Sequence, residues 1–284
     1  MDYLYKALKR ELGVAEAEPA LFPPLEEQSA EPVTAIRSNE PVAPAQFGRG
    51  KPVAFPVKLE RLFALRSEGM CKESVDVLEQ YRVLRSRVLE IMRMQQMRTL
   101  MVTSAVSGES KTTISINLAL ALSQVQGLKV LLVDTDLRKP GIADVLGIPY
   151  EIGLQDYLRS PMPLSDMMLQ LTNSLCFIPS GGIDQNSAEL LHSAAMLALV
   201  NQVQSYFDLI IFDSPPLFPI ADARVTANLM DAILFCVCAG KASETIISEA
   251  AALIRPKLIG TVRVGAEVRA SSMYYYSHGY GVKE

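Results

Sequence analysis

The architecture of this chain can be worked out from the stretch Ser104-Ala105-Val106-Ser107-Gly108-Glu109-Ser110-Lys111-Thr112-Thr113. An apolar run, residues 99–103, precedes it, and an amphipathic run, residues 114–122, comes after it. A polar, glycine-containing loop between a strand and a helix is the setting of a phosphate-binding loop. In such a loop backbone N–H groups surround the phosphates, a lysine neutralises the β/γ oxygens and a hydroxyl holds Mg²⁺. We therefore predict a nucleotide site over residues 105–113, with Lys111 and Thr112 in these last two roles.

The glycine spacing of this loop departs from the usual G-x-x-x-x-G-K-[ST] pattern. Ala105 and Ser110 stand where the two glycines are expected, and one glycine is displaced to Gly108. The residue before the lysine brings its backbone close to the phosphates, which glycine does best. We expect Ser110 to strain the loop and weaken nucleotide binding. Taken alone, the loop also suits an ordinary polar turn.

Carboxylates follow two further apolar runs. Residues 130–133 and 209–212 have the β-branched, fully apolar character of buried parallel strands. Asp134 and Asp136 follow the first run, and Asp213 follows the second. Because the carboxyl ends of parallel strands meet at one edge of a sheet, these carboxylates should face the phosphate loop. Any one of them could also be a turn or helix cap, but together they indicate a Mg²⁺-nucleotide site.

These segments, with the tail that contains Tyr274, Tyr275, Tyr276 and Tyr280, carry a family resemblance. The chain resembles the bacterial tyrosine kinases of polysaccharide synthesis, whose core is similar to the cell-division and partitioning ATPases. The resemblance runs from about Glu73 to the C-terminus. It implies an α/β fold, a P-loop NTPase-like and mostly parallel sheet with helices on both faces. It also implies ATP and Mg²⁺ as cofactors.

The resemblance assigns roles to the residues of the predicted site. A tyrosine hydroxyl has a pKa near 10 and must lose its proton as it attacks, which calls for a carboxylate nearby. The family pattern gives Asp134 to the metal or the incoming hydroxyl and Asp213 to Mg²⁺, with Thr112 as a further metal ligand and Asp136 assisting. Lys111 neutralises the transferred group. Arg138 either stabilises that group or caps a turn.

The tail tyrosines are the implied phosphoacceptors, modified in trans because a flexible tail reaches a neighbouring subunit readily. The alternative for such a cluster is a sticky terminal patch. Modification in trans requires an oligomer, and the family holds a ring of subunits together through an E-x-x-R-x-x-R pattern. Here that pattern is Glu79, Arg82 and Arg85. Residues at this spacing lie along one helix face, which otherwise would simply be solvated.

Composition limits the remaining possibilities. The net charge of −4 gives no reason to expect nucleic acid as a partner. No apolar run reaches the length of a membrane span, and the N-terminus lacks the apolar core of a signal peptide, so we expect a cytoplasmic protein. The resemblance implies a separate membrane-bound activator, a polysaccharide co-polymerase, that recruits the chain to the inner face of the membrane. With four cysteines and two histidines, neither a disulfide framework nor a zinc site is expected.

The chain divides into four predicted segments. Residues 1–16 suggest a short amphipathic helix, and residues 17–70 a disordered, proline-rich linker. Residues 71–269 form the predicted kinase domain, and residues 270–284 the tyrosine tail. Within the domain we expect a helix over about 73–94, one long helix over about 187–205 and a helix over 243–254. Strands are expected near 176–178, 233–237 and 259–264, besides the runs already described.

Three functions are compatible with these observations. The first is a tyrosine autokinase that regulates exopolysaccharide or capsule synthesis and export. The second is a nucleotide-responsive, kinase-like scaffold with little or no turnover, which the changes at Ser110 and Ser187 favour, since the family often has proline at position 187. The third is a partitioning-type ATPase, which the tyrosine tail and the Glu79 pattern disfavour.

Overall fold

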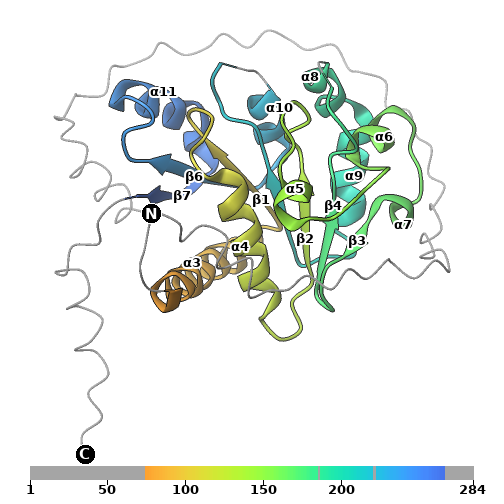
Figure 1. Ribbon diagram of the computed structural model, residues 1–284, viewed down its shortest axis with the longest axis horizontal. Helices are drawn as coiled ribbons and strands as arrows, with labels where there is room; N and C mark the ends of the chain where they lie inside the picture. The colour runs from red at the N-terminus through yellow and green to blue at the C-terminus, as the bar shows by residue number, and fades with distance from the viewer. Residues whose placement is uncertain (1–73, 185, 220–221, 266–284) are drawn as a thin grey trace, which may run out of the picture. The chain divides into compact units, whose positions relative to one another are not determined.

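The computed structural model describes residues 74–184, 186–219 and 222–265 (Figure 1). The predicted N-terminal helix, the proline-rich linker and the tyrosine tail lie outside the described residues.

A seven-stranded sheet organises the described part of the chain, in the order β3-β4-β2-β5-β1-β6-β7. All neighbouring strands are parallel except β3 and β4, which are antiparallel. The strands are β1 Thr99–Ser104, β2 Val130–Asp134, β3 Leu169–Gln170, β4 Leu175–Ile178, β5 Leu209–Asp213, β6 Ala232–Cys238 and β7 Leu258–Val264. The predicted fold class, a mostly parallel α/β sheet, is confirmed.

Helices cover both faces of this sheet, as expected for parallel strands joined by helical crossovers. One face packs against α3 Ser74–Met94, α4 Lys111–Ser123 and α5 Ile142–Leu146. The other face packs against α6 Leu154–Arg159, α7 Leu164–Met167, α8 Ser187–Leu191, α9 Ala194–Val203, α10 Asp222–Leu229 and α11 Glu244–Ile254. A single 3-10 turn, Arg255–Lys257, leads from α11 into β7.

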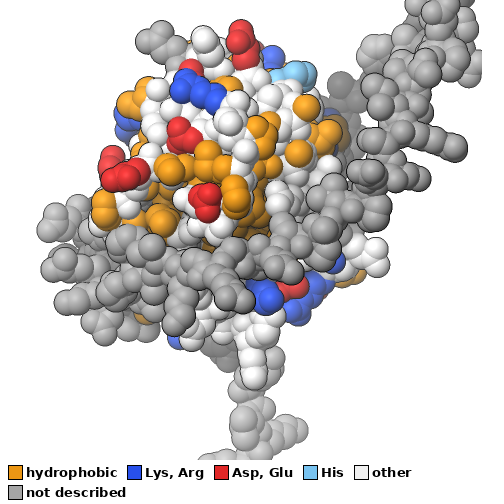
Figure 2. Space-filling view, turned by 90° about the vertical axis from the view of Figure 1, so that its right-hand side faces the viewer, with side chains coloured by type: hydrophobic (Ala, Val, Ile, Leu, Met, Phe, Trp, Pro, Cys, Tyr) orange, Lys and Arg blue, Asp and Glu red, His pale blue; other side chains and the backbone are white. Residues whose placement is uncertain are grey.

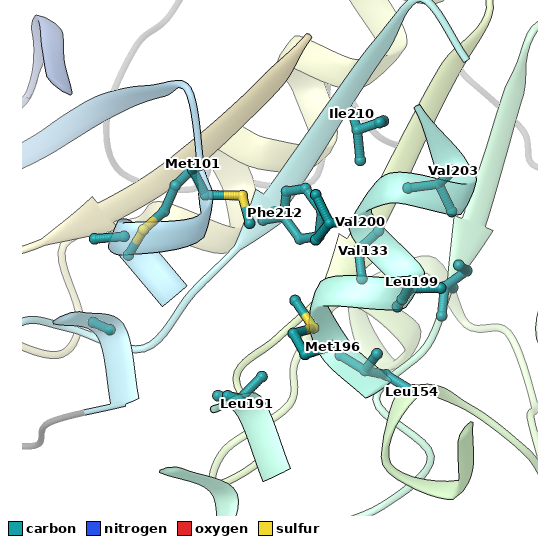
Figure 3. Close-up of a cluster of buried hydrophobic side chains, with 14 of the residues drawn as sticks. Met101, Val133, Leu154, Leu191, Met196, Leu199, Val200, Val203, Ile210 and Phe212 are labelled. Carbon is teal, nitrogen blue, oxygen red and sulfur yellow. The ribbon is translucent and has the colours of Figure 1, made fainter. Parts of the chain in front are cut away.

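Alternation along the strands divides the core into two layers. In β1, Leu100 belongs to the layer under α3 and α4, whereas Met101 belongs to the opposite layer. There Met101 and Phe212 lie opposite Met196 and Val200 of α9 (Figure 3). All four side chains are at most 2% exposed, so this contact between the sheet and α9 is fully buried. This packing fixes the carboxyl ends of the strands, where the predicted site lies.

Two elements differ from the predictions. The expected helix over 187–205 is wrong, because the structure breaks it into α8 and α9. Ser193 causes the break: its backbone is extended, and its side chain accepts a hydrogen bond from the Met196 N–H, which starts a new helix. The edge strand β3 was not predicted, since its two residues are too short for a periodic signal.

Figure 2 shows the side of the molecule that carries α6, α7 and α8. Apolar side chains gather near the middle of this face, and acidic and basic side chains are scattered among them. Within the ranges that the structure describes, no helix combines the length and the apolar character needed to cross a bilayer.

Candidate active site

Three strand ends meet at one edge of the sheet. β5 lies between β1 and β2, and Asp134 and Asp213 are register partners on the two neighbouring strands. The phosphate loop, residues 104–113, leaves the end of β1 beside them. The loop after β5 is joined to the start of the phosphate loop, because the N–H groups of Leu217 and Phe218 donate to the carbonyls of Ser104 and Ala105. The structure therefore brings together the segments that the sequence singled out.

The phosphate loop contains two residues with left-handed backbone. Gly108 has φ 81°, and Ser110, which immediately precedes α4, has φ 64°. Glycine adopts this conformation freely, but a serine pays a conformational penalty of about 1 kcal/mol or more there. The Ser110 side chain makes no capping hydrogen bond that would offset it. The expected strain at Ser110 thus has a direct backbone counterpart.

Glu109 connects the phosphate loop to strand β6. Its side chain is fully buried, and its two carboxylate oxygens accept hydrogen bonds from the backbone N–H groups of Val106 (3.0 Å) and Cys238 (3.1 Å). The motif places Glu109 among the residues predicted to contact the nucleotide. In the structure its carboxylate braces the loop from within the protein.

Lys111 is buried in the first turn of α4, with 7% of its surface exposed. Burial raises the pKa of both Asp136 and Asp213, and the positive charge of Lys111 opposes this rise, so its ammonium group acts on carboxylates from two different strand ends. Sequence reasoning missed a second lysine near the loop. The Nζ of Lys241 lies 3.9 Å from where a Cβ on Gly108 would be. Nothing local in the sequence distinguishes this residue from a surface lysine.

Thr112 and Asp213 are directly hydrogen-bonded. The Thr112 hydroxyl donates to Asp213 Oδ2 over 2.8 Å, and the Ser115 hydroxyl donates to Asp213 Oδ1 over 2.8 Å. Burial raises the pKa of Asp213 to about 6, although Lys111 and the two hydroxyls lower it. Neighbouring ligands of an octahedral Mg²⁺ ion, at ~2.0–2.1 Å from the metal, lie roughly 2.9 Å apart. The hydrogen bond holds a hydroxyl and a carboxylate oxygen side by side, and these are the two groups that Mg²⁺ would take as neighbouring ligands. Ser115 was missed by the sequence analysis.

Asp134 is fully buried and accepts hydrogen bonds from backbone N–H groups of Asp136, Gly141 and Ile142, each at 3.2 Å. Burial and the nearby Asp213 carboxylate raise the pKa of Asp134 well above its usual value. These hydrogen bonds match the turn-cap alternative for an aspartate after a strand. Its carboxylate holds the loop after β2 in shape.

Asp136 is the more accessible of the two carboxylates in this loop. Its side chain accepts the Lys139 N–H over 3.0 Å, and the residue is 9% exposed, whereas Asp134 is completely buried. Burial raises the pKa of Asp136, while the backbone N–H groups of Lys139 and Arg138 and the charge of Lys111 lower it. Asp136 therefore combines access to solvent with proximity to Lys111.

Arg138 forms an ion pair with a carboxylate of a neighbouring segment, Asp222. Its Nε donates to Asp222 Oδ2 over 2.8 Å, and the Ser187 hydroxyl donates a short hydrogen bond to the same oxygen. Asp222 is the first residue of α10 and is almost fully buried. Sequence reasoning missed Asp222. The one hint of this contact in the sequence is its partner Ser187, a polar residue at a position where the family often has proline.

The three residues of the predicted subunit interface do not share one environment. Arg82 donates to Glu79 over 3.0 Å, and both side chains are largely exposed on α3. Arg85 instead donates to the Ala121 carbonyl over 3.1 Å, near the end of α4. The exposed pair can reach a neighbouring molecule, whereas Arg85 docks α3 onto its own domain.

Comparisons with known proteins show which proteins this chain is similar to. The CobQ/CobB/MinD/ParA nucleotide binding domain family matches residues 100–219. The tyrosine-protein kinase YwqD of Bacillus subtilis is 35% identical over 211 residues, which are 72% of this chain and 87% of that protein. The succinoglycan biosynthesis transport protein ExoP of Rhizobium meliloti is 31% identical, and the match covers 65% of this chain but 25% of ExoP. The kinase domain of the Escherichia coli tyrosine kinase ETK is 25% identical with a TM-score of 0.63, over 72% of this chain and 80% of that chain.

Proposed function

The chain belongs to the family of bacterial tyrosine-protein kinases, and we propose that it transfers the γ-phosphoryl group of Mg-ATP to tyrosine. The observation that carries this proposal is the 2.8 Å hydrogen bond between Thr112 and Asp213, with the buried Lys111 beside it. Phosphoryl transfer depends mainly on positioning and on neutralisation of charge. Lys111 and Thr112, in the first turn of α4, and Asp213, at the end of β5, supply both.

Thr112 and Asp213 would hold Mg²⁺, directly or through water, and the ion would neutralise charge on the β- and γ-phosphates. Lys111 would bind the same phosphate oxygens from the protein side. The backbone N–H groups of the phosphate loop would surround the β-phosphate. Asp134 would keep the loop after β2 in place through its three backbone hydrogen bonds.

We assign the acceptance of the tyrosine proton to Asp136 rather than to Asp134. A general base must reach the incoming hydroxyl and must have free lone pairs. Asp134 is completely buried and already accepts three backbone N–H groups. Asp136 is slightly exposed and lies close enough to Lys111 for the lysine charge to favour its ionised form. Changing Asp136 to Asn should therefore lower the transfer rate more than it weakens Mg-ATP binding.

The proposed acceptors are Tyr274, Tyr275, Tyr276 and Tyr280, modified in trans within a ring of subunits. The exposed Glu79–Arg82 pair on α3 is the proposed contact between neighbours. A mixing experiment tests this arrangement. A Lys111→Met chain with an intact tail is incubated with an otherwise unchanged chain in which the four tyrosines are Phe. We expect mass spectrometry to find phosphate on the tail of the Lys111→Met chain. An unmodified tail, when the unchanged protein labels itself, would contradict transfer in trans.

We further propose that the protein acts in exopolysaccharide or capsule synthesis and is recruited to the inner face of the membrane by a separate membrane-bound partner. The similarity to ExoP, named as a succinoglycan biosynthesis transport protein, supports this role. Fractionation of cells with and without the proposed membrane-bound partner tests the recruitment. The kinase should leave the membrane fraction when that protein is deleted.

A scaffold with little turnover is the second candidate, and one observation favours it. Ser110 holds a left-handed conformation, φ 64°, directly before Lys111. Strain at that point opposes close approach of the loop to the phosphates. Mg-ATP binding without phosphotyrosine formation by the purified protein would select the scaffold over the kinase.

A further inference from the structure

The loops that follow β2, β4 and β5 are joined to one another beside the candidate active site. The Asp184 N–H, in the loop after β4, donates to the Leu137 carbonyl in the loop after β2 over 2.8 Å. Arg138 of the loop after β2 bonds to Asp222, which begins the helix after β5. Ser187 of α8 bonds to the same carboxylate. These contacts close a ring of three loops.

Asp222 is the centre of this ring. Its side chain is 1% exposed, and its oxygens accept Nε (2.8 Å) and Nη2 (3.4 Å) of Arg138 as well as the Ser187 hydroxyl. A buried carboxylate is stable only when its charge is compensated and hydrogen-bonded. Arg138 and Ser187 provide that compensation, so Asp222 holds both of them in place.

Arg138 connects this carboxylate to the reacting groups. Asp136, two residues earlier, accepts the Lys139 N–H over 3.0 Å. Burial and, to a smaller extent, the charge of Asp222 raise the pKa of Asp136, whereas the N–H groups of Lys139 and Arg138 lower it. The backbone that carries these N–H groups is fixed at Arg138 by the bond of its side chain to Asp222. A continuous series of contacts therefore runs from Ser187 through Asp222 and Arg138 to Asp136, close to Lys111.

We propose that Asp222 is a positioning residue of the phosphoryl-transfer site, which holds the Asp136 loop in its working geometry through Arg138 and is itself oriented by Ser187. This inference rests on the proposed kinase function, because Asp136 is the proposed acceptor of the tyrosine proton. Asp222 itself contacts neither the nucleotide loop nor the proposed metal ligands by any hydrogen bond found among the described residues.

The test compares Asp222→Asn, Arg138→Met and Ser187→Ala with a matched control, Arg159→Met. The control breaks a nearby ion pair between Arg159 and Asp184, at 2.6 Å. The Asp184 carboxylate is also nearly buried, but this ion pair does not include Arg138. At saturating Mg-ATP, we expect Asp222→Asn and Arg138→Met to lower kcat for phosphotyrosine formation at least tenfold and Ser187→Ala several-fold. The Kd for Mg-ADP should change less than threefold, and Arg159→Met should keep kcat within twofold of the unchanged protein.

Coupling between the residues provides a sharper criterion. Because Ser187 acts through Asp222, adding Ser187→Ala to Arg138→Met should lower kcat by less than twofold beyond the single change. The proposal would be overturned if the loss of kcat in the double variant equalled the product of the losses in the two single variants. A kcat within twofold of the unchanged protein for Asp222→Asn would also overturn it. An equal loss in Arg159→Met would also overturn it, because the effect would then be general to the loops.

Amide hydrogen exchange tests the same link without activity, in the nucleotide-free full chain. Asp222→Asn should speed exchange over residues 134–141 at least tenfold, and Arg159→Met should leave it unchanged. If Asp222→Asn does not fold, Arg138→Met tests the same contact between Arg138 and Asp222, because Arg138 is the more exposed partner. Unchanged exchange in a folded variant would refute the positioning role. An unchanged protein that forms no phosphotyrosine would refute the kinase function, while faster exchange in the variants would still support the link.

Discussion

Asp134 and Asp213 occupy the same register position on the adjacent parallel strands β2 and β5. Both carboxylates are almost completely buried, and the charge of Asp213 helps to raise the pKa of Asp134. Like charges held together in a buried site oppose ionisation. Burial of these two neighbouring carboxyl groups therefore lowers the free energy of unfolding of the nucleotide-free protein. A bound cation would remove much of this destabilisation.

This arrangement predicts how stability depends on pH. The pKa of Asp213 is about 6 in the folded protein, compared with ~3.9 in an unfolded chain. Between these values the native state holds more protons than the unfolded state, so the free energy of unfolding decreases as pH rises from about 4 to about 6. Asp213→Asn should remove this contribution and stabilise the nucleotide-free protein at pH 8 by at most about 3 kcal/mol. The gain is reduced because the amide keeps only one acceptor oxygen for the Thr112 and Ser115 hydroxyls.

Denaturant unfolding at a series of pH values measures this difference. The gain in Asp213→Asn should shrink as the pH falls to about 4, and Asp166→Asn, at an exposed carboxylate, is the control. If the variant and the unchanged protein have the same free energy of unfolding at pH 8, burial of the ionised Asp213 does not destabilise the fold.

The brace at Glu109 should support both stability and nucleotide binding. Glu109→Gln leaves one carbonyl oxygen for the N–H groups of Val106 and Cys238, so one buried donor loses its partner. We expect a loss of about 1–3 kcal/mol in the free energy of unfolding and weaker Mg-ADP binding. Glu249→Gln on the exposed side of α11 is the control. Unchanged melting and calorimetry for Glu109→Gln would contradict the brace.

Ser110 offers a test of strain in the phosphate loop. Glycine accepts φ 64° without penalty and has no side chain to hinder close approach of the loop to the phosphates, so Ser110→Gly should tighten Mg-nucleotide binding by roughly three- to tenfold, or about 1 kcal/mol. Ser110→Ala keeps the conformational cost and removes the hydroxyl, so it should bind no more tightly than the unchanged protein. Calorimetric titration separates these outcomes. Equal affinity of the glycine and serine forms would show that the loop accommodates serine.

The two arginines of the predicted interface should behave differently. Arg85→Ala removes a charged hydrogen bond to Ala121 and should destabilise the folded domain by about 1–2 kcal/mol. Arg82→Ala breaks an exposed pair within α3 and should cost less than about 1 kcal/mol, yet it should reduce the assembly to smaller species in light scattering. An unchanged mass for Arg82→Ala would remove the exposed pair from the interface.

The sequence predicted the fold well because its strands are buried on both faces. Continuous apolar runs such as residues 130–133 and 209–212 lead directly into Asp134 and Asp213, so strand position and candidate site were located together. The helix break at Ser193 was missed, since an N-cap inside an apolar pattern gives only a weak signal. Long-range partners are harder still. Asp222 lies far from Arg138 in the chain, and only the folded loops bring them into contact.

Side-chain direction was the second limit. Glu109 belongs to the phosphate loop by sequence, but its carboxylate points to backbone groups inside the protein. Asp134 and Asp136 look equivalent in the sequence, yet only Asp136 retains access to solvent. Burial of individual side chains thus distinguishes roles that motif spacing leaves equal.

Transfer of labelled phosphate from γ-labelled Mg-ATP to tyrosine, by the purified unchanged protein and by Lys111→Met, tests the kinase assignment most directly. Lys111→Met removes the buried ammonium that would face the β/γ oxygens, so we expect phosphotyrosine to fall at least about 100-fold. Circular dichroism should confirm that the variant is folded. Labelled phosphotyrosine in the unchanged protein, dependent on Mg²⁺ and lost in Lys111→Met, is the predicted result. Equal labelling of the two proteins, or none in an unchanged protein that binds Mg-ATP, would contradict it.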